Sequence, residues 1–177
     1  MSRCPNCSGP EHPWSKGAYL LPVRTESAAY LTHHEGPGHE GRTECALDLK
    51  VPIGTVVRAA REGVISDIRM GSTRGGNSRS NNHYENWIEI RHSDGETSLY
   101  GHLSDHSRLS VGDHVEAGQV IARSGATGWL AQEGPHLHFQ VTRYHGSRDN
   151  TGRSLRIRWA RGVQLPEDRE PAGSRRS

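Results

Sequence analysis

The chain has 177 residues, with 22 basic and 20 acidic side chains and a formal net charge of +2. This length suits one domain with short extensions, and the near-neutral charge excludes a dedicated nucleic-acid-binding protein, which carries a dense basic footprint. No apolar run approaches the roughly 18 residues that a membrane span needs. Because 21 residues are glycine and the Val/Ile runs are short, the composition favours strands and tight turns over long helices.

Composition divides the chain into three parts. Residues 1–16 are polar, contain several Pro and Ser and lack periodicity, which predicts an N-terminal arm. Residues 17–145 are expected to form the folded domain, and residues 146–177 an Arg-rich extension with a disordered end. Within the arm, Cys4 and Cys7 have the spacing of half a zinc site, but no second cysteine pair follows to complete it.

Two hairpins and a long loop are expected in the middle of the chain. Residues 55–60 and 63–70 are β-type runs on either side of a polar dipeptide, which predicts a first hairpin. Residues 71–84 are dominated by Gly, Ser and Asn and predict a loop at the rim of a site. Residues 87–92 alternate apolar and polar side chains, and a Ser-Asp-Gly turn leads to residues 97–102, which predicts a second hairpin.

Short strand patterns continue toward the C-terminus. Turn residues flank Val115 and residues 120–122, residues 136–142 form a further run, and residues 155–159 are a candidate last strand. Short strands at close spacing, with almost no helix pattern, predict an all-β fold built mainly from antiparallel sheet or a sandwich.

The triplet His136-Leu137-His138 is the most informative local pattern. Side chains at positions i and i+2 of a strand point to the same face, about 6–7 Å apart, so both imidazoles can reach one site. Leu137 and Phe139 then point to the opposite face, which gives the strand a buried side and a chemical side. Taken alone, such a triplet is more often a chance pair of surface histidines, so the rest of the sequence has to decide.

Two further polar residues stand out by their position. Asp48 lies among Ala46, Leu47 and Leu49, where an ionised carboxylate is costly unless a cation or hydrogen bonds compensate it. His102 ends the second strand of the second expected hairpin. The simpler alternatives are a turn-capping aspartate and an exposed histidine, but the two residues and the His triplet together favour one shared site.

Four motifs occur along the chain in a fixed order: GHEGRTECALDLKVPIGTVVRAAREGVI from Gly38, NWIEIRHSDGETSLYGHLS from Asn86, VGDHVEAGQVIARSGATG from Val111 and GPHLHFQV from Gly134. Together they resemble the lysostaphin-type, or LytM-domain, zinc metallopeptidases that cleave peptide bonds in peptidoglycan. The resemblance covers roughly residues 18–142. It implies an all-β fold of the duplicated-hybrid-motif kind with little helix.

The resemblance also implies roles for individual residues. It implies that His39, Asp48 and His138 bind Zn²⁺, and that His102 and His136 are the two catalytic histidines. Three protein ligands leave a fourth zinc position for water, and a nearby imidazole can accept a proton, so this set suits hydrolysis.

The first zinc ligand has competitors. Many members of the family place it four residues before the aspartate, where this chain has Glu44, whereas a spacing of nine residues occurs in a subgroup and points to His39. Glycines flank His39 and give its backbone freedom to turn inward. We therefore expect His39 to be the first ligand, and His33, His34 and Glu44 remain alternatives for that position.

The expected function is zinc-dependent hydrolysis of peptide bonds in peptidoglycan cross-links or stem peptides. The expected partners are peptidoglycan peptides, with no nucleic acid and no transmembrane segment, and the expected state is a monomer. The family resemblance places the protein in the cell envelope or outside the cell, although the chain starts without the apolar segment of a secretory signal peptide.

Two other functions are weaker alternatives. A non-catalytic LytM-type module that binds cell wall or activates another hydrolase would typically lack one or more metal positions, and here all five site positions have candidates. The motif from Val111 also resembles half of a biotinyl or lipoyl carrier hairpin. A carrier needs a lysine at the hairpin tip, and the only lysines of this chain are Lys16 and Lys50.

Overall fold

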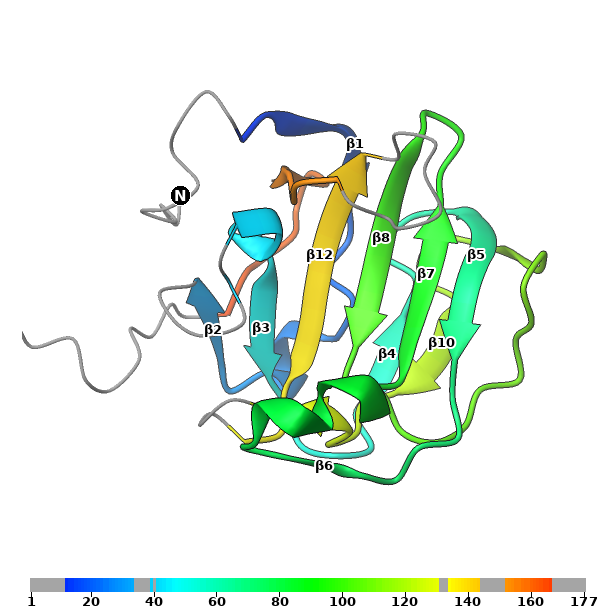
Figure 1. Cartoon of the computed structure of the whole chain (residues 1–177). Helices are drawn as coiled ribbons and strands as arrows, with labels where there is room; N and C mark the ends of the chain where they lie inside the picture. The colour runs from blue at the N-terminus through cyan, green and yellow to red at the C-terminus, as the bar shows by residue number, and fades with distance from the viewer. Residues whose placement is uncertain (1–11, 34–38, 40, 131–133, 144–151, 167–177) are drawn as a thin grey trace, which may run out of the picture.

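The centre of the molecule is one antiparallel sheet of seven strands (Figure 1). The computed structural model describes residues 12–33, 39, 41–130, 134–143 and 152–166. In spatial order the sheet contains β2 (Tyr30–His33), β3 (Leu47–Lys50), β12 (Leu137–Arg143), β8 (Glu96–Gly101), β7 (Trp87–Arg91), β5 (Gly63–Arg69) and β9 (His114–Val115).

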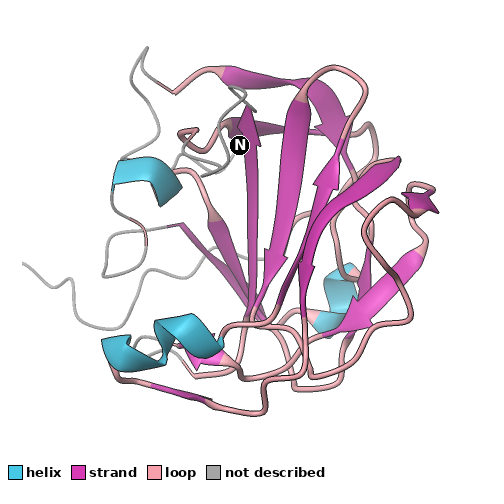
Figure 2. Cartoon of the chain, turned by 45° about the vertical axis from the view of Figure 1, so that its right-hand side comes forward, coloured by secondary structure: helices cyan, strands magenta, loops and turns pink. Residues whose placement is uncertain are grey.

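Within these residues, three two-stranded sheets and three short 3-10 helices accompany the seven-stranded sheet. The small sheets pair β1 (Trp14–Tyr19) with β13 (Arg156–Trp159), β4 (Val56–Arg58) with β10 (Val120–Arg123), and β6 (Gly75–Gly76) with β11 (Gly128–Trp129). The 3-10 helices are η2 (Thr25–Ser27), η3 (Gly41–Thr43) and η4 (Arg79–Tyr84). Figure 2 shows how little of the chain is helical, so the prediction of an all-β, mainly antiparallel fold with little helix is confirmed. In the described residues, the helices are all too short to cross a bilayer.

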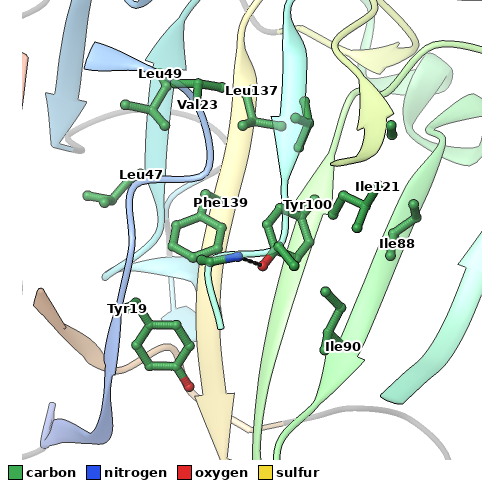
Figure 3. Close-up of a cluster of buried hydrophobic side chains, with 14 of the residues drawn as sticks. Tyr19, Val23, Leu47, Leu49, Ile88, Ile90, Tyr100, Ile121, Leu137 and Phe139 are labelled. Carbon is green, nitrogen blue, oxygen red and sulfur yellow. Dashed lines mark hydrogen bonds between the residues drawn. The ribbon is translucent and has the colours of Figure 1, made fainter. Parts of the chain in front are cut away.

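Strand alternation separates an apolar face of the sheet from a polar one. Leu137 and Phe139 of β12 lie opposite Leu49 and Leu47 of β3, and all four side chains are buried (Figure 3). Burying one such side chain contributes about 1.5–3 kcal/mol. His138, which lies between Leu137 and Phe139 in β12, is therefore turned to the other face, where the polar residues of the site gather.

A buried tyrosine joins the sheet to the neighbouring strand β4. Tyr100 of β8 is fully buried and packs its ring 5.2 Å from that of Phe139. Its hydroxyl accepts a hydrogen bond of 2.7 Å from the backbone N–H of Ala60, just after β4 (Figure 3). Burial raises the pKa of Tyr100 to about 12, so the hydroxyl keeps its proton at neutral pH.

The first expected hairpin is wrong, although both of its strands exist. β4 pairs with β10, whereas β5 pairs with β7 and β9. The backbone of Ala59 is taken by the turn before β10, because its N–H donates to Gln119 and its carbonyl accepts from Gly118. Gly63 lets β5 approach β7 closely, since a Cβ there would lie 2.5 Å from the carbonyl oxygen of Arg91. Distant partners thus outcompete the local pairing.

Other expectations from the pattern have mixed outcomes. The second hairpin is confirmed, because β7 and β8 pair in antiparallel register. The candidate last strand is confirmed as β13. Residues 71–84 are more regular than expected, since they contain β6 and η4, and the pairing of β6 with β11 holds them beside the sheet.

Both ends of the expected domain take part in strand pairing. β1 begins at Trp14, inside the segment expected to be an arm, and pairs in parallel with β13 in the expected extension. The backbone N–H groups of Lys16 and Gly17 donate to the carboxylate of Glu96, which is fully buried. The division of the chain at residues 16 and 146 stays a prediction, and Cys4 and Cys7 lie outside the described residues.

Candidate functional site

Two strands and one neighbouring segment bring three polar side chains together. Asp48 of β3 lies directly opposite His138 of β12 in the sheet, and His39 comes from the segment before η3. Asp48 Oδ1 lies 2.9 Å from His138 Nδ1, and Oδ2 accepts a hydrogen bond of 3.0 Å from His39 Nε2. One ligand atom from each residue lies within 4.8 Å of the others, a group that could hold a metal ion.

The charge of Asp48 is set by the imidazoles around it. Burial alone would raise its pKa, but His136, His39 and His138 together hold the pKa of this carboxyl well below its usual range. Burial also lowers the pKa of His39, against the attraction of Asp48, whereas the hydrogen bond from His138 to Asp48 raises the pKa of His138 despite burial. An ionised carboxylate between two imidazoles, all shielded from water, is a donor set that suits a divalent cation such as zinc.

The two remaining histidines lie beside this group. His136 shares the face of His138, and its Nε2 lies 3.3 Å from Asp48 Oδ2. His102, just after β8, has its ring centroid 4.5 Å from that of His136. The structure thus brings together all five residues that the sequence analysis names.

Backbone carbonyl groups fix which nitrogen of each of these two rings carries the proton. The Nδ1 of His102 lies 2.8 Å from the carbonyl oxygen of Thr127, and the Nδ1 of His136 lies 2.8 Å from that of Gly134. A carbonyl oxygen only accepts, so Nδ1 donates in both rings and Nε2 holds the free lone pair of the neutral form. Burial lowers the pKa of His102 to about 4, so this ring is neutral at neutral pH.

The backbone at His102 is strained. Its φ is 56°, which makes it the one non-glycine residue with positive φ in the part of the chain that the structure describes. The left-handed region costs an ordinary residue about 1–2 kcal/mol. Non-glycine residues persist there where the surrounding structure determines them, and here the bond from the ring to Thr127 does so.

Of the competitors for the first ligand, Glu44 is directed elsewhere. Its Oε2 lies 2.6 Å from Nε2 of His12, and its Oε1 accepts from the backbone N–H of Gly41. It does not belong to the three-residue group. His34 and the side chain of His33 lie outside what the structure describes.

Sequence reasoning missed Glu85, which lies at the edge of the site. Its Oε1 is 3.6 Å from Nδ1 of His102. Two glycines make room for it, because a Cβ at Gly101 would lie 2.3 Å from Glu85 Oε1 and a Cβ at Gly128 would lie 2.7 Å from Glu85 Cβ. Nothing in the local sequence links Glu85 to a histidine 17 positions later, so only the folded chain reveals this contact.

Comparison with known proteins agrees with this geometry. Residues 42–151, more than half of the chain, match Peptidase family M23. The chain belongs to this family. The family prediction made from the four motifs is thereby confirmed.

This M23 chain is similar to well-described relatives over part of their length. It is 37% identical over 103 residues to DD-carboxypeptidase/endopeptidase Mpg of Neisseria meningitidis, and the aligned region covers 58% of this chain and 21% of Mpg. It is 36% identical over 123 residues to lysostaphin of Staphylococcus simulans, and the aligned region covers 64% of this chain and 22% of lysostaphin. The chain thus spans about a fifth of the length of these relatives.

Among solved structures, the M23 chain is similar to Csd3 of Helicobacter pylori, with a TM-score of 0.51 and 25% identity over 81% of this chain and 34% of that one. The match to the family begins at residue 42. Asp48, His102, His136 and His138 therefore lie inside the matched range, whereas the assignment of His39 depends on its contact with Asp48.

Proposed function

We propose that this M23 chain is a zinc-dependent endopeptidase that hydrolyses peptide bonds in peptidoglycan cross-links or stem peptides. The observation that carries the proposal is the convergence of His39, Asp48 and His138, with one ligand atom from each within 4.8 Å of the others. The presence of two further histidines beside this group supports catalysis rather than a purely structural metal site. The relative Mpg is named a DD-carboxypeptidase/endopeptidase, which supports peptide bonds as the target.

In this proposal His39, Asp48 and His138 hold the metal. Two imidazole nitrogens and one carboxylate oxygen are a donor set typical of catalytic zinc, which keeps one position open for water. Bound zinc would supply a Lewis acid and a water molecule whose pKa is lowered to about 7.

The two other histidines handle protons and developing charge. Nε2 of His102 holds the free lone pair, because Nδ1 is engaged by Thr127, and the neutral ring can accept a proton from water or return it to the leaving amine. Nε2 of His136 lies on the Asp48 side of its ring, and once this ring has taken up a proton its Nε2–H can stabilise an oxyanion. Both rings are nearly closed to bulk water, which strengthens these interactions.

A non-catalytic module that binds cell wall is the alternative. It would tolerate the loss of single site residues, whereas this chain retains a histidine or aspartate at all five positions and packs them together. Wall binding does not require two groups for proton transfer beside the metal group, and His102 has a left-handed φ, a kind of strain that clusters at functional sites.

Digestion of purified peptidoglycan tests the proposal. The zinc-loaded chain is incubated with wall fragments of defined cross-link, and the products are resolved by mass. We expect fragments that have gained one water across one peptide bond, with no such products after chelation or in His102→Ala. Retention of the chain on the wall without any new fragment would favour the binding module instead.

A further inference from the structure

The residue His39 is held in a different way from the other two members of the metal group. Asp48 and His138 lie on strands whose backbones are hydrogen-bonded to neighbours, but in the described residues His39 lies outside every strand. Besides its own contacts, which include the hydrogen bond to Asp48, the position of His39 depends on how the segment at residues 41–45 is held. Figure 1 shows η3, which belongs to this segment, as the cyan turn at the upper end of β3.

The first anchor of this segment comes from the N-terminal end. His12 precedes β1 and is almost fully buried, and its Nε2 lies 2.6 Å from Glu44 Oε2. The other carboxylate oxygen of Glu44 accepts a 3.1 Å hydrogen bond from the backbone N–H of Gly41, two residues after His39. Gly41 has φ +63°, so this bond also fixes a turn that other residues rarely make.

The second anchor comes from the C-terminal end. Ser154 donates its backbone N–H to the carbonyl oxygen of Arg42 and accepts from the backbone N–H of Cys45 through its hydroxyl, both at 2.7 Å. The two anchors are joined, because Nε of Arg156 donates to the carbonyl oxygen of His12. Cys45 is also disulfide-bonded.

We propose that His12 and Glu44 are positioning residues that pre-organise His39 for metal binding. A ligand held in place before the metal arrives loses less conformational entropy on binding, which raises affinity. His12 lies outside the range that matches the family, so this chain couples its metal affinity to its own N-terminal segment. The inference rests on the proposed zinc site but not on any peptidase activity.

The test is the zinc dissociation constant, measured by competition with a chelator in non-reducing buffer. It compares the full-length wild type with His12→Ala, Glu44→Ala and the double variant. We expect each single change to weaken zinc binding by about 10-fold or more, in the range of partners that orient metal ligands. The double variant should bind zinc about as tightly as whichever single variant binds it less tightly, because both changes break the same contact.

A matched control is His92→Ala. His92 is buried like His12 and is hydrogen-bonded to Ser98 and to the carbonyl oxygen of Glu62, but it lies at the opposite end of β8 from His102. Thermal unfolding of every metal-free variant is recorded in parallel. We expect His92→Ala to lower the unfolding temperature while leaving zinc affinity within about twofold of the wild type.

Two results would overturn the proposal. The first is zinc affinity close to the wild type in Glu44→Ala, which removes both carboxylate oxygens of a partly exposed side chain and decides the matter even if His12→Ala does not fold. The second is an equal loss of affinity in His92→Ala, which would show general destabilisation. A wild-type chain that binds no zinc would instead contradict the proposed metal site, and one that binds zinc without hydrolysis would contradict only the proposed activity.

Discussion

The residues of the metal group are held in place in two different ways. β3 and β12 present Asp48 and His138 opposite each other because the sheet register pairs them, and a slip by one residue would turn the buried leucines and Phe139 to the polar face. The segment that follows His39, at residues 41–45, is held by side-chain contacts from His12 and Ser154, which lie far from it in the sequence. From this comparison we expect the ligands on strands, Asp48 and His138, to tolerate surface substitutions, and His39 to be sensitive to residues far away in the sequence.

Removing Asp48, a ligand held by the sheet register, should have the largest effect on zinc binding. Asp48→Ala takes away a ligand and the one negative charge that three imidazoles share, so we expect zinc content to fall below detection and hydrolysis to stop. The expected loss exceeds 100-fold in affinity, on the order of 3 kcal/mol for one ligand out of the roughly 10–16 kcal/mol of a four-ligand site. Metal analysis of the folded variant checks this, and full zinc retention would remove Asp48 from the site.

Substitutions at His39 and Glu44 should show which of the two binds the metal and which only positions the ligand. We expect His39→Ala to lose zinc by on the order of 100-fold, whereas Glu44→Ala should only weaken it by about 10-fold. Zinc titration of both variants gives the ranking. If His39→Ala keeps its zinc while Glu44→Ala or His33→Ala loses it, the first ligand has been assigned to the wrong residue.

The catalytic histidines should behave unlike either kind of ligand. His102→Ala and His136→Ala should keep zinc and lower kcat by roughly 100- to 10,000-fold, the usual range for loss of a general acid or base. The measurement is turnover of a cross-linked peptide at saturating zinc, together with metal content. Loss of metal in either variant would move that residue into the ligand set, and unchanged turnover would exclude it from catalysis.

The smallest effect concerns the strained backbone of the site. Since His102 has φ +56°, His102→Gly should be more stable than His102→Ala by about 1 kcal/mol, because glycine adopts the left-handed region without a Cβ clash. Denaturant unfolding of the two metal-free variants measures the difference. Equal stability would mean that the surrounding residues relax and that the site stores no strain at this position.

Local pattern was enough for the parts of the fold that depend on neighbouring residues. Alternation placed Leu137 and Phe139 on the buried side and His136 and His138 on the other, because successive side chains of a strand always point to opposite faces. The Ser-Asp-Gly turn was enough for the hairpin of β7 and β8, since such a turn brings adjacent runs together. The choice of site residues came from the family resemblance, which local pattern could only support.

Only the tertiary structure decided which distant segments meet. The pairing of β4 with β10, the contact of Glu44 with His12 and the approach of Glu85 to His102 each join residues that no local pattern connects. The physical reason is that a strand edge or a carboxylate can accept many partners of similar energy, and packing of the whole core selects one. The sequence by itself therefore determined which imidazole and carboxylate side chains this protein has, and the tertiary structure decided which of them lie close enough to act together.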